Sequence, residues 1–270
     1  VHHVSYPNRY RAPAGMSDAA LVAQSMNEIE GDLFTRHLDP KDVAAIFVEP
    51  VQGEGGYLFP PDGFMRALRD LCDQHGILLV ADEIQCGVGR TGHMWVCEQE
   101  GIEPDILLTA KGLGSGMPIG AIIAKKQIME HWKRGAHGNT FGGNPLSCAA
   151  AIATLDLVQS EYAANAAHVG EHFMGRLREM QRDYPCIGEV RGRGLMIGME
   201  LVENDAERTP ARALCDHLVT RGYHNGLLLL ACGVSTLRFM PPLSTTIAEV
   251  DEAIGLLRNS LDEALQGKGA

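Results

Sequence analysis

The stretch Asp105-Ile-Leu-Leu-Thr-Ala-Lys111 joins a short apolar run to a lysine at its end. An earlier apolar run, 77–81, leads directly into Asp82 and Glu83. Unbroken apolar runs of this length are typical of strands that are buried in a parallel sheet. Ligands of such sheets bind beyond the carboxyl ends of the strands. The pattern therefore predicts that Asp82 and Lys111 lie at one edge of an α/β sheet.

The first part of the chain alternates strand and helix patterns, which favours a mainly parallel sheet with helices on both faces. Ser17 is a suitable N-cap for a helix over 17–37, and Asp62 for one over 62–75 that Gly76 ends. The run 43–48 predicts a strand buried on both faces. The remaining expected strands are 77–81, 106–110 and 120–124.

After Asn144-Pro145 the pattern changes to long helices and short strands, which predicts a smaller α+β domain. Thr209-Pro210 is typical of a helix start, and Thr246 with Glu249 forms a capping box for the last helix. We expect domains over 1–158 and 159–270. The other expected elements of this part are helices 146–159 and 162–184 and strands 187–190, 195–201, 227–230 and 237–240.

Composition narrows the class of protein. The net charge of −11 over 270 residues argues against nucleic acid or an anionic membrane as the main partner. No apolar stretch approaches the roughly 18 residues that a membrane helix needs, and no signal segment opens the chain. Seven scattered cysteines without a C-x-x-C pair indicate reduced thiols and a cytoplasmic protein. The histidines show no metal-binding spacing, so no metal is expected.

Gly87-Val-Gly-Arg-Thr-Gly92 matches the glycine pattern of dinucleotide-binding loops. That fingerprint requires a tight turn immediately after the strand and a helix at the third glycine. Here 82–86 intervene, and no clear helix follows. We interpret the segment as a mobile glycine loop near a site.

A strand-end lysine and a strand-end carboxylate are the minimum equipment for binding pyridoxal phosphate. The lysine forms a Schiff base with the aldehyde, and the carboxylate keeps the pyridine nitrogen protonated. Such a pair alone is weak support, because most strand-end lysines are solvated surface groups. Three further segments bring polar groups to strand ends, and each also has an interpretation without a function. The segment 49–56 could be a solvated glycine loop, and 139–144 could be a loop that caps the next helix. Arg238, in an apolar strand, could form a structural ion pair or bind a carboxylate through its guanidinium group.

Six segments in this order resemble the class III aminotransferases, of the ω-amino acid, ornithine or 4-aminobutyrate type. They are Glu49-Pro-Val-Gln-Gly-Glu54-Gly-Gly, Ala81-Asp82-Glu-Ile-Gln85-Cys-Gly-Val-Gly-Arg-Thr-Gly92, Ala110-Lys111-Gly-Leu, Gly116-Met-Pro-Ile-Gly-Ala, Asn139-Thr140-Phe-Gly-Gly-Asn-Pro145 and Leu237-Arg238-Phe-Met-Pro-Pro-Leu. The resemblance covers nearly the whole chain. It implies a fold type I pyridoxal-phosphate-dependent transferase that moves an amino group from an amine or ω-amino acid to a keto acid.

The resemblance also implies a role for each site residue. Lys111 would form the Schiff base and shuttle the proton, and Asp82 would pair with the pyridinium nitrogen. Arg238 would bind a substrate carboxylate. Glu54 would neutralise Arg238 when the substrate has no carboxylate there. The remaining cofactor contacts would be Ile84 on the ring face, Gln85 at the phenolic oxygen, and Thr140 at the phosphate of the neighbouring subunit in a homodimer.

The match departs from the family at the start of the chain. The family's N-terminal part is missing, and with it one phosphate loop, the aromatic residue that stacks on the cofactor, and the first strands of the large domain. Residues 1–158 would then be the remnant of the cofactor domain with its linking helix. We expect a shortened but active transaminase. A catalytically weak remnant, a binding subunit that needs a partner chain, and a racemase or decarboxylase with the same motifs remain as alternatives.

Overall fold

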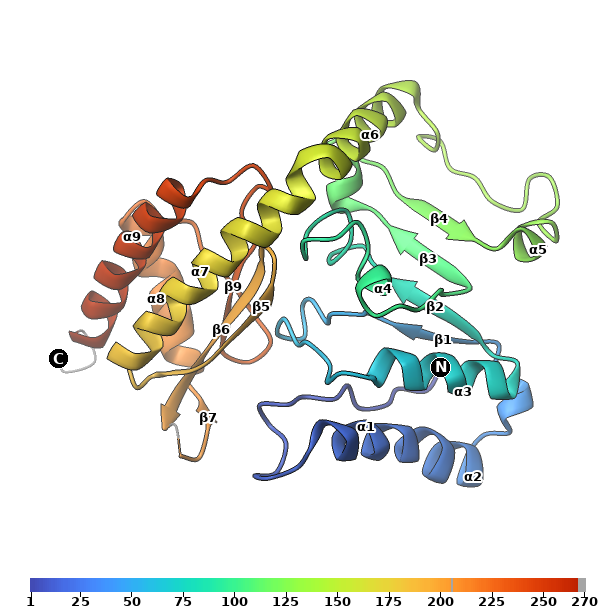
Figure 1. Cartoon of the computed structure of the whole chain (residues 1–270), viewed down its shortest axis with the longest axis horizontal. Coiled ribbons are helices and arrows are strands. Elements are labelled where there is room, and N and C mark those ends of the chain that lie inside the picture. Colours follow the sequence, from blue (N-terminus) through green and yellow to red (C-terminus); the bar gives the residue numbers. More distant parts are fainter. Residues whose placement is uncertain (205, 267–270) are drawn as a thin grey trace. The chain divides into compact units, whose positions relative to one another are not determined.

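The computed structural model describes residues 1–204 and 206–266. It divides into two compact units (Figure 1). The first unit comprises residues 1–50, 60–88 and 93–160, and the second comprises 51–59, 89–92 and 161–270. The two short segments 51–59 and 89–92 thus leave the first unit and become part of the second.

The sheet of the first unit has the predicted strands and the predicted parallel core. Its order is β1-β2-β3-β4, where β1 pairs parallel with β2, β2 parallel with β3, and β3 antiparallel with β4. The carboxyl ends of the three parallel strands therefore lie at one edge. The bounds are Ala45–Val48 for β1, Leu78–Asp82 for β2, Ile106–Thr109 for β3 and Ala121–Ala124 for β4.

Helix α3 (Phe64–His75) lies between the sheet and α1 (Asp18–Asn27), as Figure 1 shows. The Ser17 side chain accepts a hydrogen bond from the Ala20 N–H, so the predicted cap of α1 is confirmed. Its helical run continues through a π-helical stretch, Glu28–Leu33, into α2 (Phe34–Arg36). Apolar side chains of these helices and of β1 and β2 form the core of this unit: Ile29, Phe64, Met65, Leu68, Leu71, Cys72, Val48, Leu79 and Ala81.

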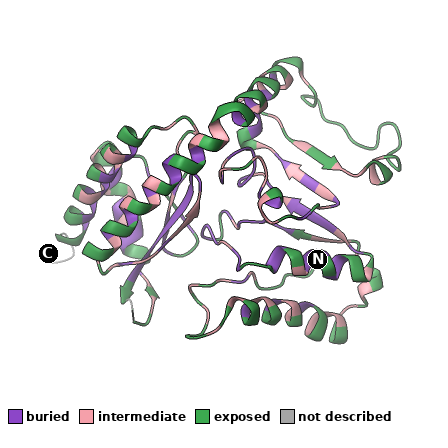
Figure 2. Cartoon of the chain, viewed as in Figure 1, coloured by how far each residue is buried: buried purple, intermediate pink, exposed green. Residues whose placement is uncertain are grey.

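Two expectations about this unit are wrong. The cap position of α3 is held by Gly63 with a φ of 89°, which offers no side-chain acceptor, and not by Asp62. Strand β1 is not buried on both faces, because Phe47 is 70% exposed. On β4, Ile122 and Ile123 are 41% and 50% exposed (Figure 2). Both strands lie at sheet edges, and no described helix covers these side chains.

The second unit is a small α+β structure around an antiparallel sheet. The sheet order is β5-β6-β9-β8, with β7 beside β6. Strand β6 is buried from Met196 to Val202 (Figure 2). Helices α7, α8 and α9 supply most of the remaining core. The bounds are Ile187–Arg193, Met196–Asn204, Thr209–Pro210, Leu230–Cys232 and Thr236–Phe239 for β5 to β9, and Ala163–Asp183, Arg212–His224 and Ile247–Gln266 for α7 to α9.

Local boundaries in this part differ from the prediction at three points. The strand expected over 227–230 is wrong, because the Leu227 N–H donates to the Gly222 carbonyl oxygen at the end of α8 and β8 begins only at Leu230. Thr209-Pro210 pairs with β6 and does not begin a helix, since α8 starts at Arg212. The two long helices predicted around residue 160 are joined without a break, because a π-helical stretch links α6 (Pro145–Leu157) to α7. The Thr246 capping box is confirmed: the Thr246 N–H donates to Glu249 Oε2 at 2.8 Å.

The short helices are α4 (Val96–Gln99) and α5 (Lys126–Met129), with 3₁₀ turns at Pro40–Asp42 and Lys111–Gly114. Nowhere in residues 1–204 and 206–266 is a helix long and apolar enough to cross a membrane. The same residues contain no group of histidine, cysteine and acidic side chains that could hold a metal ion.

Candidate functional site

Asp82 and Lys111 lie at the carboxyl ends of neighbouring parallel strands. Asp82 is the last residue of β2 and stands opposite Leu108 of β3 in the strand register. The Glu83 N–H continues the pairing with a 3.0 Å hydrogen bond to the Leu108 carbonyl oxygen. Lys111 follows β3 after Ala110 and begins a 3₁₀ turn. Both charged side chains are therefore presented at the edge where such sheets bind ligands.

The carboxylate of Asp82 is fixed by the loop that it precedes. Its Oδ1 accepts a hydrogen bond from the Ile84 N–H at 3.0 Å, and the side chain is half-buried. The same turn sets the directions of Ile84, which is half-buried, and of Gln85, which is only 9% exposed. Asp82, Ile84 and Gln85 thus form one compact turn after β2.

Backbone strain gathers where this turn meets the segment after β3. Lys111 has a φ of 43° and Val88 a φ of 53°, both in the left-handed region that glycine favours. For a β-branched residue such as Val88 this conformation is a genuine outlier. A Cβ atom added at Gly112 would lie 3.6 Å from the Val88 Cβ, so the two segments touch. Strained residues persist where the surroundings over-determine them, and they cluster at functional sites.

The glycine loop is packed rather than loosely exposed. A Cβ at Gly87 would lie 2.7 Å from the Glu83 carbonyl oxygen and 2.8 Å from the Trp95 ring, so glycine is required there. Val88 is 2% exposed. The next helix, α4, begins only at Val96, which removes the geometry of a dinucleotide-binding loop.

Glu83 was not among the predicted site residues, yet it organises this loop. The side chain is fully buried, and its carboxylate accepts hydrogen bonds from the N–H groups of Val96 at 3.0 Å and Cys97 at 2.8 Å. Burial raises the pKa of Glu83, although these donors oppose the shift. The carboxylate thereby closes the loop between β2 and α4. In the sequence Glu83 looks like one more acid after a strand, so nothing marked it.

Asp105 is a second carboxylate that the sequence did not single out as functional. It accepts hydrogen bonds from the Leu79 N–H and Arg69 Nη1, both at 2.8 Å, and from Lys125 Nζ at 3.0 Å. Burial alone would raise the pKa of Asp105, but these three donors outweigh it and lower the pKa. Asp105 ties β2, α3 and the residue after β4 together at the amino ends of β2 and β3, opposite the edge that carries Asp82 and Lys111.

Thr140 lies in the exposed loop that leads into α6. The structure shows the helix-capping alternative for its neighbour: Asn144 Oδ1 accepts the Ser147 N–H at 2.9 Å at the start of α6. A phosphate contact of Thr140 across a dimer stays a prediction.

Glu54 and Arg238 form an ion pair in the second unit. Arg238 lies on β9 between Gly198 of β6 and Leu230 of β8, and its side chain is 15% exposed. The Glu54 side chain is 69% exposed. A mostly buried guanidinium with an exposed carboxylate partner is suited to exchange that partner for another carboxylate.

The predicted site residues thus form two groups. Asp82, Ile84, Gln85 and Lys111 meet at the sheet edge of the first unit, and Thr140 belongs to the same unit. Glu54 and Arg238 meet in the second unit.

Comparison with known proteins decides the family. The model of the family described as aminotransferase class-III matches residues 1–261. The chain belongs to the class-III aminotransferases. A 5-aminovalerate aminotransferase, DavT, from Pseudomonas aeruginosa is 42% identical over 234 residues, which are 86% of this chain and 55% of that protein. Ornithine aminotransferase 2 from Staphylococcus aureus strain MRSA252 is 42% identical over 221 residues, 81% of this chain and 53% of that protein.

Solved structures of this class share the fold. The omega transaminase from Pseudomonas jessenii in complex with PMP superposes with a TM-score of 0.92 at 31% identity, covering 99% of this chain and 61% of that one. An amine transaminase from an uncultivated Pseudomonas species in the PLP-bound form gives 0.89 at 34% identity, with 97% and 61% covered. The fold is therefore a fold type I transferase fold, and the chain spans about half the length of the curated relatives it matches.

Proposed function

We propose that this chain transfers an amino group from an amine or ω-amino acid to a keto acid, with pyridoxal phosphate as cofactor. The observation that carries the proposal is the placement of Lys111 and Asp82 at adjacent strand ends in a member of the class-III aminotransferases. Structural relatives are described with PLP or PMP bound, which supports the choice of cofactor.

The residues present fit this cofactor. Asp82 offers a carboxylate whose direction is fixed by the Ile84 N–H, suited to a protonated pyridine nitrogen. Lys111 offers an exposed amine on a strained backbone one strand away, suited to covalent attachment and to moving a proton. Ile84 and Gln85 would contact the ring and its phenolic oxygen. When bound, the cofactor supplies an electron sink for the bond that breaks at the amino carbon.

The Glu54–Arg238 pair supports the proposed range of donors. Arg238 would bind the carboxylate of an ω-amino acid or keto acid in a charge-assisted, bidentate manner. Glu54 would return to Arg238 when the donor is a simple amine. The exposure of Glu54 permits this exchange, because one partner can move into water while Arg238 stays in place.

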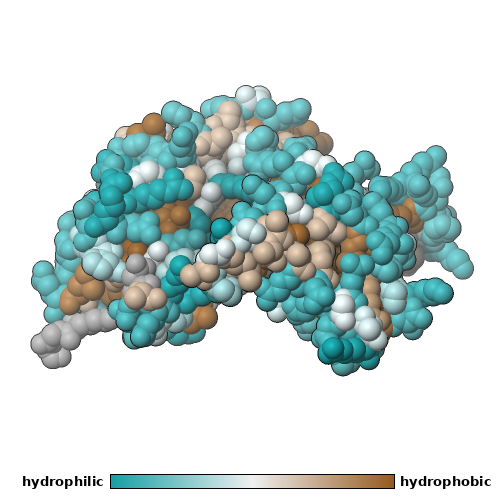
Figure 3. Space-filling view, turned by 60° about the horizontal axis from the view of Figure 1, so that its bottom comes forward, coloured by the Kyte–Doolittle hydropathy of each residue, from teal (hydrophilic) through white to brown (hydrophobic). Residues whose placement is uncertain are grey.

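We propose further that the active form is a cytoplasmic homodimer in which Thr140 reaches the cofactor phosphate of the partner. Large apolar side chains are exposed near Thr140 and on α6, including Phe141 at 79%, Leu146 at 68% and Ile152 at 63%. Figure 3 shows hydrophobic areas within a mostly hydrophilic surface. Exposed apolar patches mark interaction surfaces. All seven cysteines are free thiols, which supports a reducing compartment.

A panel of donors tests the proposal. Purified chain with added pyridoxal phosphate is incubated with ω-amino acids and simple amines, each with pyruvate or 2-oxoglutarate. Amino-acid formation that depends on both donor and keto acid supports a transaminase. Interconversion of amino-acid enantiomers without a keto acid would instead indicate a racemase, and absence of any turnover a binding-only remnant. The relatives named above are all aminotransferases, which favours the first outcome.

A further inference from the structure

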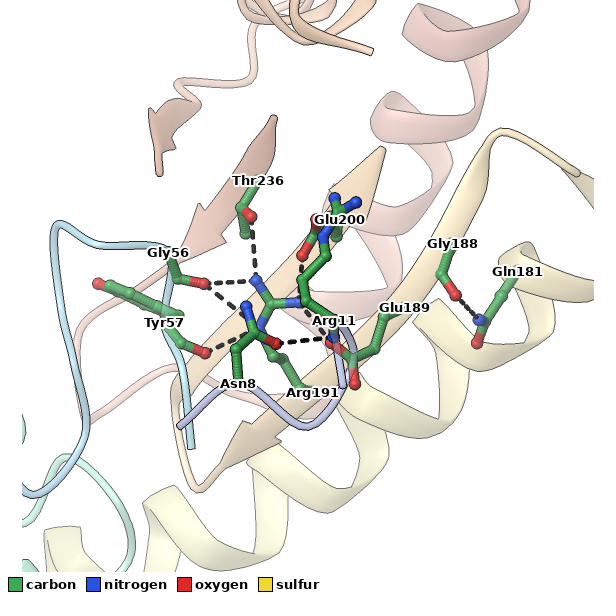
Figure 4. A network of polar contacts seen from close by, with 10 residues as sticks. All are labelled: Asn8, Arg11, Gly56, Tyr57, Gln181, Gly188, Glu189, Arg191, Glu200 and Thr236. Carbon is green, nitrogen blue, oxygen red and sulfur yellow. Dashed lines mark hydrogen bonds and ion pairs between the residues drawn. The ribbon is translucent and has the colours of Figure 1, made fainter. Parts of the chain in front are cut away.

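Arg191 of β5 is part of the polar network that Figure 4 shows. Its side chain is 10% exposed, and Nη1 pairs with Glu200 at 2.7 Å and Glu189 at 2.5 Å. Nη2 donates to the Thr236 hydroxyl at 3.0 Å. These contacts fix the guanidinium across β5, β6 and β9.

The other donors of Arg191 reach the segment that carries Glu54. Nη2 donates to the Gly56 carbonyl oxygen at 2.6 Å, and Nε donates to the Tyr57 carbonyl oxygen at 2.9 Å. Tyr57 is fully buried and has a φ of 53°, a left-handed conformation that non-glycine residues avoid. A conformation of this kind persists only when neighbouring contacts hold it. Arg191 supplies two such contacts immediately after Glu54.

A further contact holds the other side of the same turn. The Gly233 N–H donates to the Glu54 carbonyl oxygen at 2.8 Å. The backbone around Glu54 is thus fixed at successive points, while the Glu54 side chain reaches Arg238 and remains 69% exposed. The result is an exposed carboxylate on a backbone that is held in place.

We propose that Arg191 is a positioning residue that keeps Glu54 close to Arg238 and so sets how strongly the protein discriminates against ligands that bring their own carboxylate. Because Glu54 is tethered, it competes with a free carboxylate at a high effective concentration. Loosening the tether lowers that concentration and makes Arg238 more accessible. The inference rests on the proposed role of Arg238 as the carboxylate-binding residue.

Arg191→Lys is the most informative variant. Lysine keeps a positive charge between Glu189 and Glu200, but a single ammonium cannot reproduce the fork that reaches Gly56 and Tyr57. Glutarate is a suitable probe, since it has two carboxylates and neither an amine nor a keto group to react. Isothermal titration calorimetry of the cofactor-loaded full chain measures its Kd. We expect Arg191→Lys to bind glutarate about two- to five-fold more tightly, because Glu54 is 69% exposed and an ion-pair partner so exposed opposes the ligand by only that much.

Tighter binding separates this role from a merely structural one, since a loosened fold weakens binding. Glu54→Gln removes the competing charge directly and should also tighten binding. If Arg191 acts through Glu54, adding Arg191→Lys to Glu54→Gln changes the Kd no further. Arg212→Ala is the matched control: Arg212 is an arginine of the same unit whose side chain is 70% exposed and pairs with Asp216 on α8, so the Kd should stay at the wild-type value.

The outcomes are distinct. Glutarate binding that depends on Arg238 but is unchanged or weaker in folded Arg191→Lys overturns the inference alone. Wild-type binding no better than that of Arg238→Ala overturns the proposed carboxylate site and the inference with it. If Arg191→Lys does not fold, Glu200→Gln decides, because it frees one side of the guanidinium and retains every residue of the 51–59 segment. A smaller shift in the same direction then supports the inference, and an unchanged Kd refutes it.

Discussion

The strand-end edge of the first unit and the Glu54–Arg238 pair of the second unit are supported by opposite charges. Around Asp82 and Lys111 the buried organiser is a carboxylate, that of Glu83, which accepts backbone N–H groups. A second buried carboxylate, Asp105, does the same at the amino ends of these strands. Around Glu54 and Arg238 the organisers are buried guanidinium groups that donate to backbone carbonyls.

Arg90 is an example of a buried guanidinium group that donates to backbone carbonyls. It donates to the carbonyl oxygens of Leu195 at 3.2 Å and Pro241 at 2.6 Å, and burial lowers its pKa to about 10. The first arrangement fixes the groups that we propose to act on every donor. The second holds an ion pair of which one partner, Glu54, is exposed and is proposed to give way to a substrate carboxylate. Loss of a group at the strand ends should therefore affect all donors alike, and loss at the pair should depend on the donor.

The largest effect is expected for Lys111→Ala. Removing the group that we propose to attach the cofactor and to move the proton should lower kcat by about 10³-fold or more for every donor, because general acid–base catalysis alone contributes about 10²–10⁴-fold. Lys126→Ala is the matched control, since Lys126 is 88% exposed in a weak surface pair. If one donor keeps its wild-type kcat in Lys111→Ala, the proposed difference between the strand-end edge and the Glu54–Arg238 pair is wrong.

Asp105→Asn should have the largest effect on stability. It leaves the Arg69 guanidinium, 8% exposed, without its buried carboxylate, and such a loss costs about 3–5 kcal/mol. Urea unfolding measures the change. Asp73→Asn is the control, because Asp73 pairs with the same arginine but is 65% exposed, and such pairs contribute about 0–1 kcal/mol. Equal losses in the two variants would contradict the role of Asp105.

The pH dependence of that stability has a defined sign. The pKa of Asp105 is lower in the folded protein, where its three donors outweigh burial. Its contribution is therefore fully present above the unfolded value, about 3.9, and is lost as the pH falls through the folded pKa. Unfolding curves of wild type and Asp105→Asn should converge in acid. A constant difference down to low pH would contradict this assignment.

Asp82→Asn should lower kcat about 10- to 100-fold, equally for all donors. The amide oxygen can still accept the Ile84 N–H, so the turn remains, but the charge that we propose to face the cofactor nitrogen is lost. Hydrogen bonds to charged groups are worth about 1.5–3 kcal/mol. Steady-state kinetics with an ω-amino acid and with a simple amine measure the loss. If kcat falls much more for one class of donor than for the other, Asp82 acts in substrate selection instead.

Arg238→Ala is expected to have the smallest effect and to depend on the donor. KM should rise about 10-fold for an ω-amino acid, which loses a charge-assisted contact, and change little for a simple amine. Arg212→Ala provides a control at an arginine whose side chain is 70% exposed. A uniform change for both donor classes would remove the distinction between the two regions.

The sequence predicted the strand-end edge because apolar runs and the residues that follow them are local features. Asp82 and Lys111 each follow their own run, and parallel pairing brings them together. The exposure of Phe47 could not be predicted, because an apolar strand has the same sequence whether or not a neighbour covers it. The cap of α3 lies at Gly63, whose φ of 89° is a left-handed conformation that glycine adopts without a steric cost.

Contacts distant in sequence explain the rest. The role of Arg191 depends on Gly56 and Thr236, which lie far from it along the chain, so no local pattern marked it. Glu83 and Asp105 resemble ordinary acids until their backbone partners are known. The ion pair of Glu54 with Arg238, by contrast, was indicated by the family's motifs and is present.

Covalent labelling tests the central claim most directly. The chain is incubated with pyridoxal phosphate, reduced with borohydride, digested and mapped by mass spectrometry. We predict that the pyridoxyl group is found on the peptide that contains Lys111 and not on Lys125 or Lys126. A reduced protein in which Lys111 is unmodified would contradict the account.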